Sequence, residues 1–432
     1  MIQTLKNAWK TVELRNKLLF TLLIIILYRL GAVIPMPYVN SQVLETYFNS
    51  VSGGSVFQYL NILSGEAFSK ATLFALSISP YITSSIVMQL LTIAIPALER
   101  LQKSGDDGRK KITQITRIVT VGLGLIMSIG YYMFMKNTSG ILTDKGDSFF
   151  GAVVIISVYC AGSSLIMWLA EKINENGIGN GISIILFANI VASAPAIVNG
   201  MIYLATNVSV ANIITIVFGV IFALVIVYFV VFMTNSERRL PVQYAKRVVG
   251  RKMYGGQSSN LPIKINMNGV MPIIFANSII SLPTTIMLFF PAPKEGTFWY
   301  GFQQLFNYTS PIYWVLNFIL IIAFAYFYAA ISFNPVEVAN NLKKNGGSIT
   351  GIRPGKPTAD YIQKVLNRVV LIGAIFLGVI SVVPLILGSF APALNGFAFG
   401  GSSLLIVVGV ILETEHEIEA QLTMRHYKGF LE

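Results

Sequence analysis

Charged side chains are scarce in this sequence. Asp, Glu, Lys and Arg make up 12% of the 432 residues, whereas apolar residues make up 54%. A soluble domain usually carries about 25% charged residues, so a soluble protein of this size could not cover its surface with so few. Intrinsic disorder is excluded too, because disordered segments are poor in apolar residues. The composition therefore predicts a polytopic membrane protein.

Recognisable catalytic and nucleotide-binding motifs are also missing. Residues 177–181 (GIGNG) resemble a nucleotide-binding loop, but no strand precedes them and the third Gly comes too early. Gly355-Lys356 resembles the end of a phosphate-binding loop, yet Pro357 stands where Ser or Thr would bind magnesium. His416-Glu417 begins like a zinc-protease motif, but Ala420 replaces its second His. We therefore expect no enzymatic activity, no cofactor and no metal site.

Cysteine and clustered acid are rare as well. The single cysteine, Cys160, lies in an apolar run and excludes an intrachain disulfide, so we interpret it as a small hydrophobic residue. Acidic residues gather at one place only, near the end of the last apolar run. A solvated helix end is favoured over metal binding for these four residues: Glu413, Glu415, Glu417 and Glu419.

Ionisable residues are almost absent from the apolar runs. The exception is Arg29, which we expect to pair with backbone carbonyl groups. Ion-coupled transporters need carboxylates or histidines at membrane depth, so the absence of these residues from the apolar runs argues against an ion-coupled transporter. The polar residues at this depth are neutral and favour hydrogen bonds between helices: Gln89, Asn180, Asn189, Asn277 and Asn317.

Apolar runs long enough to cross the hydrocarbon layer recur ten times. In lipid their backbone must satisfy its own hydrogen bonds, so each is predicted to be a helix. The predicted spans are 18–37, 71–95, 115–135, 149–170, 179–203, 211–233, 269–291, 311–333, 367–388 and 399–415.

Basic residues are distributed unequally about these spans. If the N-terminus is cytoplasmic, 26 of the 31 Lys and Arg residues lie on the cytoplasmic side, four lie outside, and Arg29 lies within a span. This asymmetry predicts that both termini are cytoplasmic. Ten spans divide into halves of five, residues 1–205 and 206–432. An odd number per half gives the halves opposite orientations, as in inverted repeats with a path at their interface.

Two predicted cytoplasmic loops, 234–268 and 334–366, are long and basic. The first loop holds seven Lys and Arg residues, and six more lie between Lys343 in the second loop and Arg368 just after it. The basic residues could serve only to fix the orientation of the protein in the membrane, or they could form a docking surface for an acidic protein or for RNA phosphate. The length of the loops favours docking, because fixing orientation does not need loops of more than 30 residues. Val242 and Tyr244, with Ile263 and Ile265, suggest short strands in the first loop.

A further segment, residues 57–70 (FQYLNILSGEAFSK), precedes the second span. Phe57, Leu60, Leu63 and Ala67 fall near one face of a helix. The segment is too short to cross a membrane. It is therefore expected to lie on the outer interface or to fold back into a cavity.

Five stretches of the chain stand out as long motifs: GIGNGISIILFANIV (177–191), RRLPVQYAKR (238–247), GGQSSNLPIKINMNGVMPIIFA (255–276), FNPVEVANNLKKNGGSITGIRPGKPT (333–358) and GGSSLLIVVGV (400–410). These motifs resemble the SecY family, the channel-forming subunits of the bacterial Sec protein translocon. The resemblance runs through the whole chain in order. It implies an all-α polytopic membrane protein of the bacterial plasma membrane, with ten transmembrane helices in two inverted five-helix halves around a central hourglass pore.

The resemblance also implies a function and a set of pore residues. The protein would conduct unfolded polypeptides across the membrane and release membrane helices sideways into it. A ring of aliphatic side chains would close the pore by excluding water: Ile78, Ile82, Ile182, Leu186, Ile274 and Ile406. Residues 57–70 would form a plug, represented by Phe57, Leu60, Leu63 and Glu66. Glu66 departs from the small residue usual in the family.

Gate and partner residues follow from the same resemblance. A lateral gate would open between the second and third spans and the seventh and eighth, near Gln89, Arg117, Asn277 and Ser278. The basic loops would dock the SecA motor ATPase and the ribosome through Arg238, Arg239, Lys246, Arg247, Arg251, Lys252, Lys343, Lys344, Arg353 and Lys356. Further implied partners are the SecE and SecG subunits, polypeptides with signal sequences, and the lipid bilayer. The alternatives are a small-solute secondary transporter, and a membrane scaffold or insertase without a through-pore.

Overall fold

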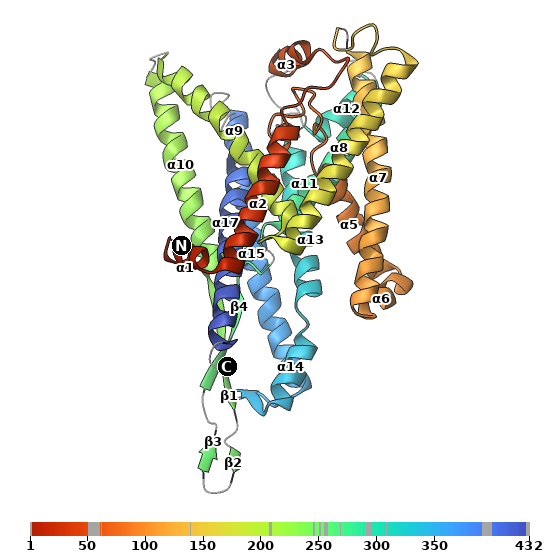
Figure 1. The fold of residues 1–432 in the computed structure, drawn as a ribbon. Coiled ribbons are helices and arrows are strands. Elements are labelled where there is room, and N and C mark those ends of the chain that lie inside the picture. The colour runs from red at the N-terminus through yellow and green to blue at the C-terminus, as the bar shows by residue number, and fades with distance from the viewer. Residues whose placement is uncertain are drawn as a thin grey trace.

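The computed structural model describes the chain except for residues 1, 51–60, 62, 139, 207–209, 245–246, 250–251, 255–257, 268, 288, 291–295, 308, 391–399 and 429–432. Its helices form an upright bundle (Figure 1). They are α1 (Ile2–Lys10), α2 (Val12–Gly31), α3 (Ser41–Ser50), α5 (Ser79–Ala94), α6 (Pro96–Lys103), α7 (Asp106–Asn137), α8 (Phe149–Asn176), α9 (Gly181–Thr206), α10 (Val210–Asn235), α11 (Met271–Met287), α12 (Phe298–Leu305), α13 (Pro311–Ser332), α14 (Pro335–Lys344), α15 (Lys356–Phe390) and α17 (Gly400–Lys428).

Each predicted span overlaps one helix of the bundle: α2, α5, α7, α8, α9, α10, α11, α13, α15 or α17. By length and apolar composition alone, five described stretches could each cross a membrane, and the bent pair α5 and α6 would make a sixth. Among the others, Met271–Met287 and the stretch Gly181–Pro195 of α9 are apolar but shorter, and α2 and α17 carry charged residues. Large apolar side chains such as Ile214 and Leu224 are exposed on the outside of α10, as expected of helices that face lipid.

The second predicted span differs most from its helix. Residues 71–78 form turns, and α5 begins only at Ser79, with Pro80 in its first turn. Proline suits this position because the first N–H groups of a helix have no partner within it. After Ile95 the chain bends by 100° into α6. The bend leaves α6 toward the end of the bundle where α14 and the strands also lie, which we call the basic end (Figure 1).

The first basic loop forms strands, as its apolar residues suggested. β1 (Glu237–Tyr244) pairs antiparallel with β4 (Ser258–Lys264), with Val242 opposite Ser259. β5 (Gly347–Ile349), from the second loop, pairs with the other edge of β1, with Val242 opposite Ile349. The order β4-β1-β5 therefore joins both basic loops in one sheet. β2 (Arg247–Val249) and β3 (Lys252–Tyr254) form a separate hairpin beyond it.

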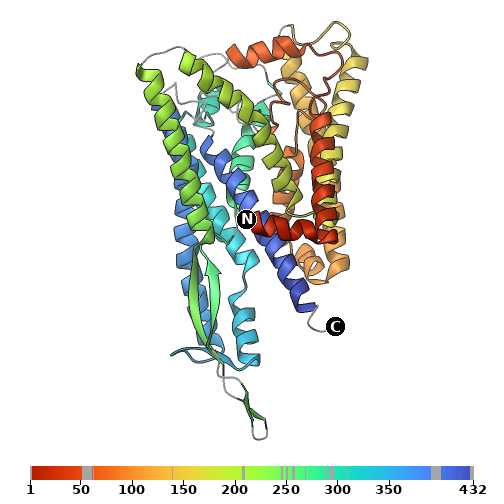
Figure 2. The ribbon, with the colours of Figure 1, turned by 60° about the vertical axis from the view of Figure 1, so that its left-hand side comes forward.

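The main hydrophobic core lies between the two halves. Its buried side chains come from α2, α5, α8 and α9 of the first half and from α10, α11, α13, α15 and α17 of the second. A smaller core packs α3, α7 and α8 at the end opposite the basic end. In the view of Figure 2, α1 lies against α17 and joins elements from opposite ends of the sequence.

Candidate functional site

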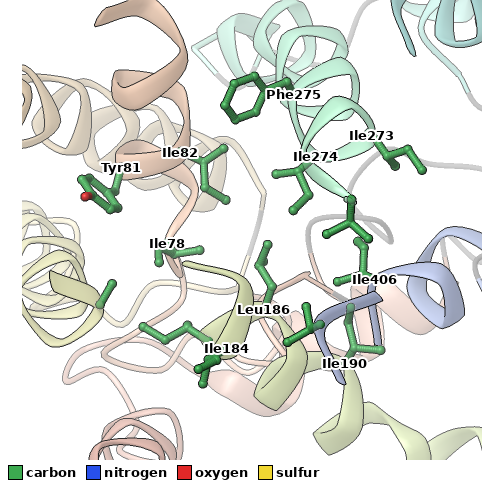
Figure 3. Close-up of a cluster of buried hydrophobic side chains, with 14 of the residues drawn as sticks. Ile78, Tyr81, Ile82, Ile184, Leu186, Ile190, Ile273, Ile274, Phe275 and Ile406 are labelled. Carbon is green, nitrogen blue, oxygen red and sulfur yellow. The ribbon is translucent and has the colours of Figure 1, made fainter. Parts of the chain in front are cut away.

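Five of the six predicted ring residues lie together in the core. Ile78 and Ile82 come from the start of α5, Leu186 from α9, Ile274 from α11 and Ile406 from α17 (Figure 3). Each is at most 4% exposed. The sixth, Ile182, is partly buried against the same cluster. The structure thus packs branched apolar side chains of both halves into one cluster, which we call the constriction after the predicted ring.

The side chains of the constriction are tightly packed. The cavity beside it measures about 10 Å³ and is lined by Leu63, Ile82, Leu186, Ile274 and neighbouring Ser and Thr residues, among them Ser278. A water molecule needs a cavity of roughly 10–15 Å³, so at most one water fits there. Ions keep a hydration shell unless polar groups replace it, and these aliphatic side chains offer none.

The predicted plug is only partly described. Phe57 and Leu60 lie outside the described residues. Leu63 packs against the constriction, which fits a segment that folds back into a cavity. Residues 64–70, however, form consecutive turns, so the helical face predicted for Leu63 and Ala67 does not exist there.

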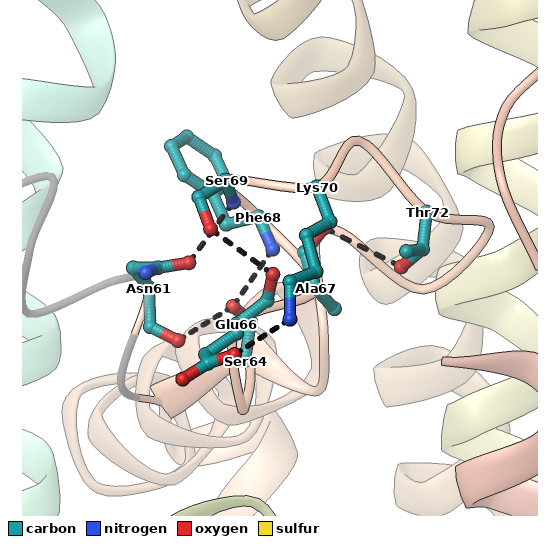
Figure 4. Close-up of polar contacts among 8 residues, drawn as sticks. All are labelled: Asn61, Ser64, Glu66, Ala67, Phe68, Ser69, Lys70 and Thr72. Carbon is teal, nitrogen blue, oxygen red and sulfur yellow. Dashed lines mark hydrogen bonds and ion pairs between the residues drawn. The ribbon is translucent and has the colours of Figure 1, made fainter. Parts of the chain in front are cut away.

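Polar side chains explain these turns (Figure 4). The N–H of Ser69 donates to Asn61 Oδ1 at 2.9 Å, and the N–H of Phe68 donates to Ser64 Oγ at 3.0 Å. Such local bonds give the backbone an alternative to a helix. Glu66 adopts φ +68° and pairs with Lys70 at 2.7 Å. The unusual Glu66 is therefore paired and half-buried, and among the described residues of the predicted plug Leu63 lines the cavity at the constriction.

One predicted gate residue bridges the halves. Gln89 on α5 accepts a hydrogen bond from Tyr328 Oη on α13 at 2.9 Å. The pair borders a cavity of about 370 Å³ between α5, α7 and α13, which Met88 and Thr116 also line. Sequence reasoning missed Tyr328, which was one aromatic residue among many in an apolar run.

The other predicted gate residues bond within their own halves. Arg117 on α7 pairs with Glu171 on α8 at 2.8 Å, both in the first half. Asn317 on α13 donates to Asn277 Oδ1 on α11 at 3.3 Å, both in the second half. Ser278 donates to Ile274 O on its own helix. Gln89, Asn277 and Asn317 bond between helices as expected, whereas Asn180 Oδ1 accepts the N–H of Ile182 at the start of its own helix at 3.0 Å. Among the described bonds of the four predicted gate residues, only the one at Gln89 joins the two halves.

We expect the change Tyr328→Phe to loosen the gate. The change removes the hydroxyl that donates a hydrogen bond to Gln89 and keeps the aromatic ring. A typical hydrogen bond contributes about 0.5–1.5 kcal/mol to stability. Its loss should therefore raise the population of the open gate about two- to tenfold. The measurement is export of a precursor with a weakened signal sequence. Tyr326→Phe is the matched control, because Tyr326 Oη bonds Asn367 O within the second half. Equal export by both variants would contradict the role of Tyr328.

The predicted docking residues that the structure describes lie at the basic end. Arg238 and Arg239 are exposed on β1, Lys343 and Lys344 end α14, and Arg353 and Lys356 flank the start of α15. Arg239 pairs with Glu237 at 2.6 Å. Arg247 and Lys252 belong to the β2–β3 hairpin, whereas Lys246 and Arg251 lie outside the described residues. The sheet brings residues of both loops onto one surface.

The acidic residues near the end of α17 do more than face solvent. Glu417 Oε2 accepts a hydrogen bond from the N–H of Gly179, just before α9, at 2.8 Å. Glu419 accepts one from Thr4 of α1 at 3.3 Å. In the described part of the chain, no group of three His, Cys, Asp or Glu residues is placed to hold a metal ion. The acidic segment thus ties α17 to the first half.

Comparison of the sequence with known proteins shows the family of this chain. The SecY family model matches residues 72–415. The protein translocase subunit SecY of Streptomyces galbus is 43% identical over 450 residues, which cover all of both chains. The chain belongs to the SecY family. It is accordingly a channel subunit of a protein translocase, and these relatives do not support the alternative of a small-solute transporter.

Three solved structures share the fold. A protein-conducting channel matches with a TM-score of 0.64 and 16% identity, covering 94% of this chain and 92% of that one. A SecY protein studied for a plug domain that stabilises the closed channel matches with 0.61 and 17%, at 94% and 92% coverage. Sec61 in a canine ribosome–channel complex matches with 0.60 and 15%, again at 94% and 92%. The protein is thus an all-α polytopic membrane protein.

Proposed function

We propose that unfolded polypeptides cross the bacterial plasma membrane through the constriction between the two halves, and that apolar helices leave it sideways into lipid. The observation that carries this proposal is the apolar ring, since Ile78, Ile82 and Leu186 of the first half meet Ile274 and Ile406 of the second. Branched apolar side chains exclude hydrated ions yet offer a passing chain no strong binding site. The protein performs no catalysis in this mechanism, so a partner or ongoing synthesis supplies the energy.

Crosslinking tests the path directly. A stalled secretory chain should crosslink to a photoactivatable probe at Ile274 in the ring. The same probe at Ile319, which is 56% exposed on the outside of α13, should give little crosslinking. Equal labelling at both positions, or none at Ile274, would favour a scaffold or insertase without a through-pore.

We further propose that residues 1–205 and 206–432 move apart as two bodies during opening. The bond between Gln89 and Tyr328 supports a gate between α5 and α7 on one side and α11 and α13 on the other. The neighbouring cavity, with Met88 among its lining residues, is suited to an arriving apolar signal helix. Closure would then restore one hydrogen bond and the contacts of the ring.

Partners are proposed from the surfaces they would cover. The basic end would face the cytoplasm with both termini and dock SecA or the ribosome, because its Arg and Lys residues complement acidic or phosphate groups. A groove of about 360 Å³ between α2, α9 and α17, lined by Leu22, Phe187 and Ile411, joins both halves and would receive a helix of SecE. Cysteine crosslinking from Leu22→Cys to SecE tests that contact. SecG completes the proposed complex.

A further inference from the structure

A buried amide lies directly behind the constriction. Asn189 is fully buried on α9, one turn beyond the ring residue Leu186. Its Nδ2 donates to Leu63 O of the plug at 2.7 Å and to Ser77 Oγ at 3.1 Å. Its Oδ1 accepts from Tyr28 Oη at 2.7 Å and from Arg29 Nη1 at 3.4 Å. Both donors and both acceptor positions of this amide are therefore occupied.

The plug segment is held closely at this point. Ser77 Oγ also donates to Leu63 O, at 3.3 Å, so this one carbonyl accepts two hydrogen bonds. A Cβ at Gly65 would lie 2.8 Å from Arg29 Nη1 and 3.1 Å from the backbone of Asn189. The turn at Gly65, with φ +63°, thus packs closely against Arg29 of α2 and the backbone of α9, and a side chain there would be strained. Among the described residues, the hydrogen bond of Arg29 goes to this side-chain amide oxygen, whereas the sequence predicted backbone carbonyls as its partners.

All of these attachments belong to the first half. Tyr28 and Arg29 lie on α2 and Asn189 on α9, and a further bond joins Tyr131 Oη of α7 to Phe68 O at 2.6 Å. From the second half, the plug residue Leu63 meets the apolar side chain of Ile274 beside the cavity. Separation of the two halves would therefore leave these described hydrogen bonds intact.

We propose that Asn189 is a latch that holds the plug in the closed channel, so that opening takes two separable steps. Parting of the gate removes the ring contacts from the second half, and the plug then leaves only when Leu63 O separates from the Asn189 amide. The inference rests on the proposed function, in which residues 57–70 form the plug. Asn189 acts as a positioning residue in this device, since it contacts the plug and not the passing chain.

The change Asn189→Leu tests the latch, because leucine has a similar volume and no donors. Purified channels in planar bilayers should show a resting ion conductance about tenfold above wild type, which corresponds to a loss of 1.4 kcal/mol in plug retention. Ser193→Ala is the matched control on the same helix, since Ser193 Oγ bonds only Ile190 O in the described structure. Wild-type conductance in a folded Asn189→Leu channel would overturn the proposal.

A second variant guards against loss of folding. Ser77 adopts φ +50°, which favours glycine, so Ser77→Gly removes the hydroxyl while relieving the backbone. It should raise conductance without lowering the thermal midpoint, whereas a merely structural role would change the midpoint and leave conductance per folded channel unchanged. Deletion of residues 57–70 separates the two proposals. If deletion raises conductance and neither substitution does, the latch is wrong and the plug stands; if deletion has no effect, the plug assignment is wrong.

Discussion

Replacing Ile78, Ile82, Ile274 and Ile406 together by glycine will make the resting channel leak ions. These side chains close the constriction, and the cavity beside it has room for at most one water. Four glycines would open a continuous wet path, because a constriction that excludes water by its apolar lining cannot do so without side chains. We expect resting conductance at least about tenfold above wild type, since each 1.4 kcal/mol lost from the seal gives a factor of ten.

The control for this prediction must lower the stability of the protein without changing a side chain of the constriction. Ile166 and Ile173 of α8 are as fully buried as the ring residues and belong to the same core, but α8 contributes no side chain to the constriction. Their replacement by glycine, at two sites against four, should lower stability by a comparable amount per substitution and leave conductance per folded channel unchanged. The ring assignment would be wrong if both sets of variants conducted alike, or if the ring variant kept wild-type conductance.

The change Arg353→Glu will nearly abolish motor-driven export while the protein still folds. Arg353 is exposed just before α15, and its carbonyl, which the substitution keeps, accepts the Thr358 hydroxyl at 2.8 Å. A partner with an acidic or phosphate surface would then meet a like charge, which costs several kcal/mol. We expect SecA-dependent translocation to fall by about tenfold or more, at 1.4 kcal/mol per factor of ten.

Two comparisons make this prediction specific. Lys145→Glu reverses an equally exposed charge in the loop between α7 and α8, far from the basic end, and should leave translocation unchanged. Raising the salt concentration should weaken motor binding to wild type more than to Arg353→Glu, because screening acts on the attraction that the variant has lost. Full export by Arg353→Glu would exclude this residue from the docking surface.

Hydrophobic patterning predicted the elements of this fold well. The apolar runs were long enough that a lipid-exposed backbone left only helices, and each run overlaps one described helix. The strands around Val242 and Ile263 were confirmed as β1 and β4, because alternation between turns is a local signal. The conformation of the plug segment was harder to predict. Leu63 and Ala67 have a helical spacing, but the side chains of Ser64 and Asn61 accept hydrogen bonds from backbone N–H groups. Such bonds compete with helix formation, and hydrophobic periodicity does not reveal them.

Partners across the bundle could not be predicted from the sequence. Neutral amides at membrane depth indicated hydrogen bonds between helices, but not which residue would receive each bond. Gln89 accepts a hydrogen bond from Tyr328, more than two hundred residues away in the sequence, whereas Arg117 forms a salt bridge with Glu171 in its own half. Asn189 joined α2, α9 and the plug. Such choices depend on the final packing of helices, which no local pattern encodes.

The sheet at the basic end has a mechanical consequence. β1 continues almost directly from α10, β4 leads into α11, and β5 lies between α14 and α15, while α14 follows α13. Because β4, β1 and β5 are hydrogen-bonded side by side, a load applied anywhere on this sheet is shared among four long helices of one half. A partner that pushes on this sheet would therefore act on α10, α11, α13 and α15 as a unit and not on one helix alone.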